Sequence, residues 1–184
     1  MKSQTIAKSP VGRLFVRMLG MAMESRFRYR FFGPENILKG TDNLAGLAVL
    51  EVGCGTGFFT MPAAQLIGNK GRLVAIDVVP ESVELVSRKA QVAGLKNVSV
   101  IRADALCTGL DSESFDAVLL FGVIPSPMLP LNLLLPEMRR VLKPGGTLAV
   151  WPPVPIRWVP KSIGQSGLFN FSSKRNNVYT FTRC

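Results

Sequence analysis

The 184-residue chain has no histidine, and this absence argues against several classes of enzyme. Hydrolases built on Ser-His-Asp or Cys-His arrangements need an imidazole as their general base, and many metal centres need one as a ligand. Only three cysteines are present, at no zinc-like spacing, which argues against a disulfide scaffold or a structural metal. An enzyme of this composition must use little proton chemistry, or take its acid or base from Asp, Glu, Tyr or Lys.

Long apolar runs are also absent. No run approaches the roughly 20 residues that span a bilayer, and the first ten residues lack the apolar centre of a secretory signal. Hydrophobic residues nevertheless make up 47% of the chain and charged residues 18%, a balance typical of a globular domain. Without disulfides, we expect a cytoplasmic protein with no stable membrane insertion and no bound metal.

The formal net charge of +10 is concentrated at the two ends of the chain. Residues 1–40 carry eight Lys or Arg against two Glu, and residues 151–184 carry five against none, whereas residues 41–150 are nearly neutral. Basic ends can contact nucleic acid, anionic lipid or an acidic substrate, or can simply be solvated. The interleaved basic and aromatic residues 26–32 leave the same alternatives open, and we favour a helix that packs its rings on the sheet.

Apolar runs alternate with helical segments from residue 47 onwards. The runs predict parallel strands over 47–52, 73–77, 98–101, 115–121 and 147–151. Helices are expected over 58–67, 80–93, 131–142 and, as a short one, 162–167, with a Lys-Pro-Gly-Gly turn at 143–146. Period-two runs at 168–172 and 178–182 flank a turn at 174–177, which predicts an antiparallel hairpin.

This order of elements predicts an α/β fold. We expect a doubly wound, Rossmann-like, mostly parallel seven-stranded sheet with a C-terminal antiparallel hairpin. The whole of residues 1–184 is expected to form a single domain. Its parts would be an N-terminal helical cap over 1–40, a ligand-binding core over 41–150 and the hairpin region over 151–184.

Three alternating glycines follow the first predicted strand, in Val49-Leu-Glu-Val-Gly-Cys-Gly-Thr-Gly57. Glycine lets the backbone turn sharply and leaves no Cβ to block a ligand. A dinucleotide site would need a further glycine where Phe58 stands, because the following helix must pack closely there. Glu51 is a poor neighbour for phosphate. The loop therefore suits a ligand without a pyrophosphate, and one that carries a cationic or amino group.

Acidic residues follow the next two strands. Asp77 ends the second, where a carboxylate can accept two hydrogen bonds from the cis-diol of a ribose. Asp104 follows the third, in a place to bond an adenine amino group, and Phe121–Gly122 ends the fourth. Ligands bind at the carboxyl ends of the strands in open sheets, so the ordered set predicts a site at that edge.

These runs, together with Leu142-Lys-Pro-Gly-Gly-Thr147, resemble the class I S-adenosylmethionine-dependent methyltransferases from about Gly46 to Val150. The branch that looks most similar includes small-molecule enzymes of quinone biosynthesis. The resemblance implies that S-adenosylmethionine is the cofactor, with its methionyl part on the glycine loop, its ribose on Asp77 and its adenine at Asp104. Glu51 would organise the loop. The cofactor-binding residues implied in this way are Glu51, Gly53, Cys54, Gly55, Thr56, Gly57, Asp77, Val78, Asp104, Ala105, Phe121 and Gly122.

The activity that the resemblance implies is methyl transfer to an unidentified acceptor, which we expect to be a small molecule. Amino-methylating enzymes carry Asn/Asp-Pro-Pro-Tyr/Phe near Phe121, but this chain has Phe-Gly-Val-Ile-Pro-Ser. The alternatives are an RNA or other nucleic-acid methyltransferase, favoured by the charge, and a non-catalytic cofactor-binding partner subunit. The second alternative is favoured by the short segments after the fourth and fifth strands, which leave little chain for a lid over the substrate. No residue is singled out as a catalytic base. A homo-oligomer, formed through the apolar segment 124–135, is left open.

Overall fold

The computed structural model describes residues 33–152 and 158–184. Its elements are α4 (Pro34–Leu38), β1 (Ala48–Val52), α5 (Thr60–Ile67), β2 (Arg72–Asp77), α6 (Pro80–Val92), β3 (Val98–Arg102), β4 (Phe115–Phe121), α7 (Leu131–Val141), β5 (Leu142–Trp151), α8 (Trp158–Gly164), β6 (Phe169–Arg175) and β7 (Val178–Arg183). Most of the predicted helical cap, residues 1–32 with the basic and aromatic run, lies outside the described residues. None of the helices described has the length and hydropathy needed to cross a membrane.

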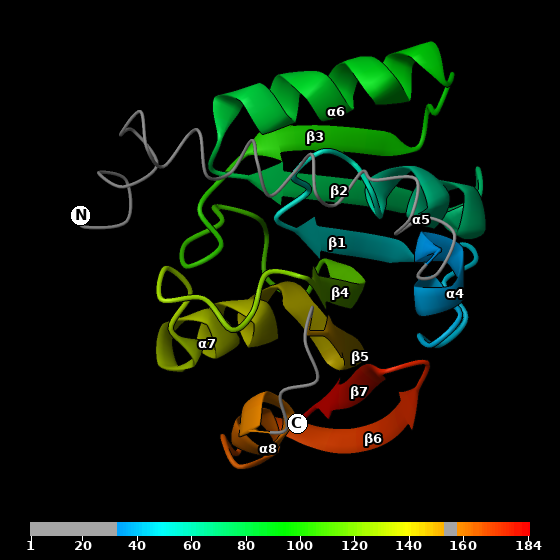
Figure 1. The fold of residues 1–184 in the computed structure, drawn as a ribbon. Coiled ribbons are helices and arrows are strands. Elements are labelled where there is room, and N and C mark those ends of the chain that lie inside the picture. The colour runs from blue at the N-terminus through cyan, green and yellow to red at the C-terminus, as the bar shows by residue number, and fades with distance from the viewer. Residues whose placement is uncertain (1–32, 153–157) are drawn as a thin grey trace.

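The seven strands form one sheet in the order β3-β2-β1-β4-β5-β7-β6 (Figure 1). The first five strands in this order pair in parallel, whereas β7 pairs antiparallel with both β5 and β6. The predicted fold class, a mostly parallel doubly wound sheet closed by an antiparallel hairpin, is therefore confirmed. The chain order reverses at β1, so the ends of β1 and β4 lie at a switch point of the sheet.

Apolar layers cover both faces of the sheet, which explains why the central strands are almost continuously hydrophobic. On one face, Leu50 of β1 belongs to a buried cluster with Leu134 and Met138 of α7. On the other face, Val49 belongs to a cluster with residues of α4 and α5. The helix α6 adds Val86, which packs with Ala75 of β2. Both layers exclude water from the strands while leaving their carboxyl ends free to carry a site.

Two predicted elements are wrong in detail. The turn expected at 143–146 lies inside β5, which begins at Leu142. Phe115 pairs with Leu142 and Ala117 with Thr147, so β5 holds extra residues opposite β4, and the positive φ of 74° at Gly145 accommodates the irregularity. The short helix expected at 162–167 is α8, which begins four residues earlier at Trp158.

The hairpin turn is tighter than the predicted four-residue turn. Only Asn176 and Asn177 separate β6 from β7, and their φ angles are 50° and 61°. Asparagine tolerates this left-handed region better than most residues, because its short polar side chain bonds locally. Two-residue hairpin turns with positive φ at both positions match the twist of the strands that they join.

The hairpin turn is fastened to the segment that precedes β1. Arg175 Nη2 donates a hydrogen bond to Asp42 Oδ1 at 2.6 Å, and Asn176 Nδ2 donates to the Asn36 carbonyl at 2.7 Å. Gly40 allows this approach, since a Cβ there would lie 2.3 Å from the Arg175 carbonyl oxygen. Residues that are more than 130 positions apart in the chain thus close one side of the sheet.

We predict that Gly40→Ala destabilises the protein by about 1–3 kcal/mol, because the added methyl must displace backbone in a packed contact. Denaturant unfolding would measure the change. Lys39→Ala is the matched control, since Lys39 is exposed and its truncation should shift the free energy of unfolding by less than about 0.5 kcal/mol. Equal stability of the two variants would contradict the contact between Gly40 and the hairpin.

Candidate functional site

The carboxyl ends of β1, β2, β3 and β4 lie side by side, because these strands are neighbours in the sheet. The glycine loop after β1 is tied to β2 by two main-chain hydrogen bonds. The amides of Gly53 and Cys54 both donate to the Ile76 carbonyl, at 2.8 and 3.1 Å. The loop therefore lies directly over the end of β2, beside Asp77.

Two of the loop glycines are required for different reasons. At Gly53, φ is 75° and a Cβ would lie 2.4 Å from Val123 Cγ1, so the loop passes tightly against the segment that follows β4. At Gly55, φ is 52°, but no atom lies within 4 Å of the position that a Cβ would take. Gly55 thus presents bare backbone to an open space, as a loop that receives a ligand must.

The Asp77 carboxylate joins the end of β2 to the glycine loop. Its Oδ2 accepts a hydrogen bond from the Gly55 amide at 2.9 Å, and its Oδ1 accepts one from the Val79 amide at 3.0 Å. Burial raises the pKa of Asp77, and the amides of Val79, Gly55 and Val78 partly offset that rise. Each carboxylate oxygen has a second lone pair, so Asp77 can also accept hydrogen bonds from a ligand.

Glu51 is a buried acid beneath the same loop. Its side chain is 3% exposed, and among the described residues neither its Oε2 nor the Thr60 hydroxyl oxygen has a hydrogen-bond partner. Burial raises the pKa of Glu51 to about 8, with the nearby Thr60 hydroxyl acting in the opposite direction and the Asp77 charge adding to the rise. A positive group at the loop would favour the charged form of Glu51.

Cys54 and Thr56 hold the loop in place through packing and a main-chain contact. The Cys54 side chain is buried with Ala75 and Val86, and burial followed by the charges of Asp77 and Glu51 raises the pKa of its thiol. A neutral, buried thiol packs as a small apolar group and is not reactive. The Thr56 carbonyl accepts a hydrogen bond from Lys89 Nζ at 2.9 Å, which ties the loop to α6.

The turn after β3 places Asp104 next to Asp77. The amide of Ala103 donates to the Asp77 carbonyl at 3.1 Å. Asp104 Oδ1 accepts from the Leu106 amide at 2.9 Å, and the Asp104 carbonyl accepts from the Cys107 amide at 3.0 Å. Ala105 is buried in the main apolar cluster, so the turn is anchored while Asp104 stays partly exposed.

The end of β4 contributes mainly its backbone. The ring of Phe121 is buried and lies edge-on to Phe59, with ring centroids 5.1 Å apart. The Gly122 amide donates to the Trp151 carbonyl at 2.8 Å, which holds the end of β4 against β5. Sequence reasoning missed Val123 and Lys89, since no local pattern marks a residue that contacts the loop from another strand or helix.

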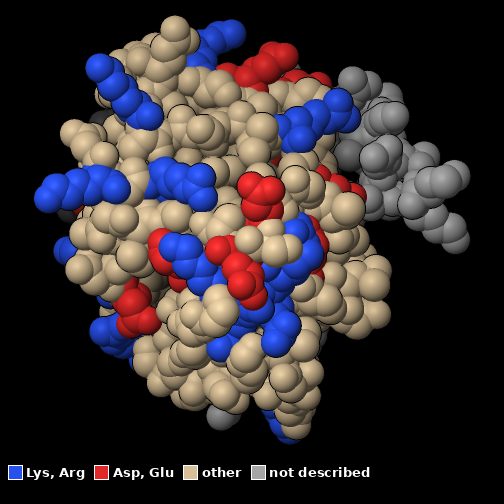
Figure 2. All heavy atoms as spheres, turned by 180° about the vertical axis from the view of Figure 1, so that it is seen from behind, with Lys and Arg blue, Asp and Glu red and all other residues tan. Residues whose placement is uncertain are grey.

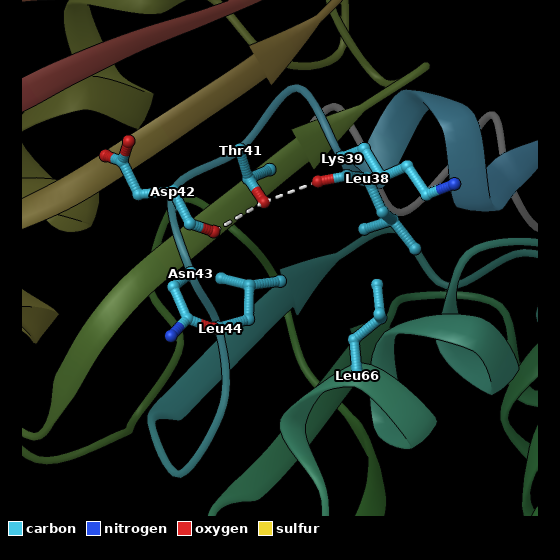
Figure 3. Close-up of a pocket in the computed structure, with 7 residues that line it drawn as sticks. All are labelled: Leu38, Lys39, Thr41, Asp42, Asn43, Leu44 and Leu66. Atoms are coloured by element: carbon cyan, nitrogen blue, oxygen red, sulfur yellow. Dashed lines mark hydrogen bonds between the residues drawn. The ribbon is translucent and has the colours of Figure 1, made fainter.

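A hollow lies at the opposite edge of the sheet, before β1 and beside the end of α5 (Figure 3). It has a volume of about 190 Å³ and is lined by Leu38, Lys39, Thr41, Asp42, Asn43, Leu44 and Leu66. The Thr41 hydroxyl already has main-chain partners, since it donates to the Leu38 carbonyl at 2.6 Å and contacts the Asp42 carbonyl at 3.0 Å. None of the predicted site residues lines it, so the carboxyl edge is the better candidate.

A family model described as a methyltransferase domain matches residues 49–146, which is more than half of the chain and includes every residue of the predicted site. The chain belongs to this methyltransferase domain family. The match confirms the resemblance that the glycine loop, the acids at the strand ends and the Lys-Pro-Gly-Gly run indicate.

Three individual relatives of this methyltransferase domain are informative. Aklanonic acid methyltransferase DauC of Streptomyces sp. strain C5 is 32% identical over 132 residues, which are 70% of this chain and 59% of that protein. Demethylmenaquinone methyltransferase of Lactococcus lactis is 30% identical over 110 residues, 59% of this chain and 43% of that protein. A crystal structure of an S-adenosylmethionine-dependent methyltransferase from Aquifex aeolicus superposes with a TM-score of 0.74 at 26% identity, covering 90% and 96% of the two chains. The chain thus spans about half the length of the curated relatives.

The burial of Glu51 predicts a pH-dependent stability. A carboxyl whose pKa rises from 4.5 to about 8 on folding holds a proton that the unfolded chain releases. Its contribution to stability is therefore complete below pH 4.5 and is lost as the pH rises towards 8. Replacement by Gln removes this contribution, so the stability of Glu51→Gln relative to the parent should increase with pH, by up to ~1.4 kcal/mol per pH unit.

Denaturant unfolding at several pH values between about 5 and 8 checks this prediction. Glu81→Gln is the control, because Glu81 is an exposed residue in the first turn of α6 and its replacement should leave the pH dependence unchanged. A constant difference between Glu51→Gln and the parent across this range would show that Glu51 is already charged in the folded protein.

Proposed function

We propose that this chain binds S-adenosylmethionine at the carboxyl ends of β1 to β4 and transfers its methyl group to a small-molecule acceptor. The observation that carries the proposal is the hydrogen bond between Asp77 Oδ2 and the Gly55 amide. This bond joins Asp77, the proposed ribose ligand, directly to the glycine loop that is proposed to bind the methionyl part. The proposed adenine position at Asp104 follows directly from there, through the bond between Ala103 and Asp77.

The chemistry of the site fits the charge of this cofactor. S-adenosylmethionine carries a positive sulfonium and a positive ammonium, and the site offers Asp77 and the unpartnered Oε2 of Glu51. The open side of Gly55 leaves room for the ligand. Phe58 is buried and packs edge-on against Phe59 at 4.9 Å, so the helix start lacks the small residue that lets the helix of a dinucleotide site pack closely on the strand.

The proposed reaction makes modest demands on the protein. The bound cofactor supplies a methyl group that is activated by its sulfonium. The residues of the chain need only bind the cofactor, orient it and exclude water, and such positioning can account for effective molarities of ~10⁵ M or more. The absence of histidine is consistent with a reaction in which the protein positions the reactants and transfers no proton through an imidazole. A base for a hydroxyl or thiol acceptor is not assigned.

A small-molecule acceptor is supported by the relatives and by the surface. The two curated relatives are named for aklanonic acid and demethylmenaquinone, which are small molecules. On the face shown in Figure 2, acidic side chains lie among the basic ones over the middle of the molecule, whereas other Lys and Arg side chains stand apart from one another. A nucleic-acid partner usually selects a continuous basic surface, so this face favours the small molecule. Assembly as a homo-oligomer and a cytoplasmic location stay predictions.

Transfer of labelled methyl groups tests the function. The purified protein is incubated with methyl-labelled S-adenosylmethionine and a cell extract, which is then separated into organic-soluble, RNA and protein fractions. We expect label in the organic-soluble fraction. Label in RNA would favour the nucleic-acid alternative, and binding of the cofactor without any transfer would favour a non-catalytic partner subunit.

A pair of glycine substitutions tests where the cofactor binds. Gly55 and Gly46 both have positive φ, at 52° and 77°, and neither has an atom within 4 Å of the position of a Cβ. Alanine should therefore strain both backbones similarly, by about 1–2 kcal/mol. Only Gly55→Ala places a methyl in the proposed ligand space, and we predict that it weakens binding of S-adenosylhomocysteine roughly tenfold or more.

Calorimetric titration of both variants measures the effect. The Gly46→Ala protein should bind S-adenosylhomocysteine as the parent does, because Gly46 lies before β1 at the opposite edge of the sheet. If Gly55→Ala also bound like the parent, the glycine loop would not be the cofactor site.

A further inference from the structure

The segment between β3 and β4 is fastened to α7 at Thr108. The Thr108 amide and the Thr108 hydroxyl both donate hydrogen bonds to Glu137 Oε1, at 2.8 and 2.7 Å. Thr108 is 8% exposed and the Glu137 side chain 12%, so both groups lie largely out of water. The Thr108 oxygen in turn accepts from the Leu110 amide at 3.2 Å. One carboxylate oxygen thus fixes both the main chain and the side chain of this residue.

Arg140 holds Glu137 in place for this task. Its Nε donates to Glu137 Oε2 and its Nη2 to Glu137 Oε1, both at 2.8 Å, so the pair is bidentate. Hydrogen bonding from Arg140 lowers the pKa of Glu137 to about 2, with the Thr108 hydroxyl and amide adding to the effect. A further bond from Arg140 Nη1 reaches the Ser112 hydroxyl at 3.0 Å. The anchor is therefore a charged group that stays ionised at any working pH.

This anchor lies next to the proposed adenine position. Three residues separate Thr108 from Asp104, and the turn between them is closed by the hydrogen bond from the Cys107 amide to the Asp104 carbonyl. On the other side of Asp104, Ala103 is bonded to Asp77. The turn is thus fixed at two points, at Asp77 by β2 and at Thr108 by α7. Asp104 Oδ1 accepts from the Leu106 amide, which leaves Oδ2 available to a ligand.

We infer that Glu137 is a positioning residue: through Thr108 it holds the turn that presents Asp104 Oδ2 to the exocyclic amino group of adenine, and so sets the preference for that base. The inference rests on the proposed function. Under this inference α7 takes part in cofactor recognition indirectly, although no residue of α7 is among the proposed cofactor contacts. Glu137 acts only through Thr108.

The contacts of Glu137 indicate why a conservative change should weaken the anchor. Glu137 Oε1 accepts from the Thr108 amide, the Thr108 hydroxyl and Arg140, and Oε2 accepts from Arg140 as well. Glutamine replaces one oxygen with an NH₂ group. In one orientation this group faces the Thr108 amide, and in the other it faces Arg140 Nε, so either the bonds to Thr108 or the bidentate pair with Arg140 is lost. The milder variant Thr108→Val removes only the hydroxyl and keeps the amide bond to Glu137.

The test compares two ligands that differ at the base. S-inosylhomocysteine carries a carbonyl where S-adenosylhomocysteine carries the amino group, so Asp104 Oδ2 would lose a donor. The parent should prefer the adenine ligand by roughly 10- to 100-fold, the range for a charged hydrogen bond. In Glu137→Gln the ratio of the two dissociation constants should fall to about threefold or less, and in Thr108→Val it should fall in the same direction but less far.

A control separates recognition from general stability. Glu113→Gln breaks another ion pair, the 2.7 Å contact with Arg183, without touching the turn, so it should keep the ratio of the parent even if it unfolds more easily. If both Glu137→Gln and Thr108→Val keep the ratio of the parent and still bind S-adenosylhomocysteine, the positioning role of Glu137 is overturned and the proposed function is not. Failure of the parent to bind S-adenosylhomocysteine would overturn the proposed function and this inference with it. If Glu137→Gln does not fold, Thr108→Val decides.

Discussion

The hydrogen bond from the Gly55 amide to Asp77 Oδ2 is the contact on which the site depends. Together with the main-chain bonds from Gly53 and Cys54 to the Ile76 carbonyl, it holds the loop after β1 against the end of β2. The same loop passes tightly by Val123, because Gly53 has no Cβ to meet that side chain. The loop, the acid and the segment after β4 therefore form one connected edge.

Burial of charge gives this edge its chemical character. Glu51 and Asp77 both have raised pKa values because the surrounding layers exclude water, and the charge of Asp77 raises the pKa of Glu51 further. Such a pair is unfavourable for phosphate and favourable for a ligand that brings positive charge. The cost of burying two acids near each other is typical of a binding site, where local stability is given up for ligand affinity.

The sequence predicts those parts of the structure that have a local sequence pattern. Apolar runs, the glycine alternation and the acids at the strand ends have local signatures, and they predict the mostly parallel sheet, its C-terminal hairpin and the edge expected to carry the site. Contacts between distant segments have no such signature. The approach of Val123 to Gly53, the bond from Lys89 to Thr56 and the fastening of Thr108 to Glu137 depend on packing between elements. The pairing of Phe115 with Leu142, which draws the predicted turn into β5, has the same origin.

A crystal structure of the protein with S-adenosylhomocysteine tests the central claim most directly. The account predicts the ribose hydroxyls within hydrogen-bond distance of the Asp77 carboxylate and the homocysteine part over the loop from Gly53 to Gly57. The ligand bound at another place, such as the hollow between Leu38 and Leu66 at the opposite edge of the sheet, would contradict it.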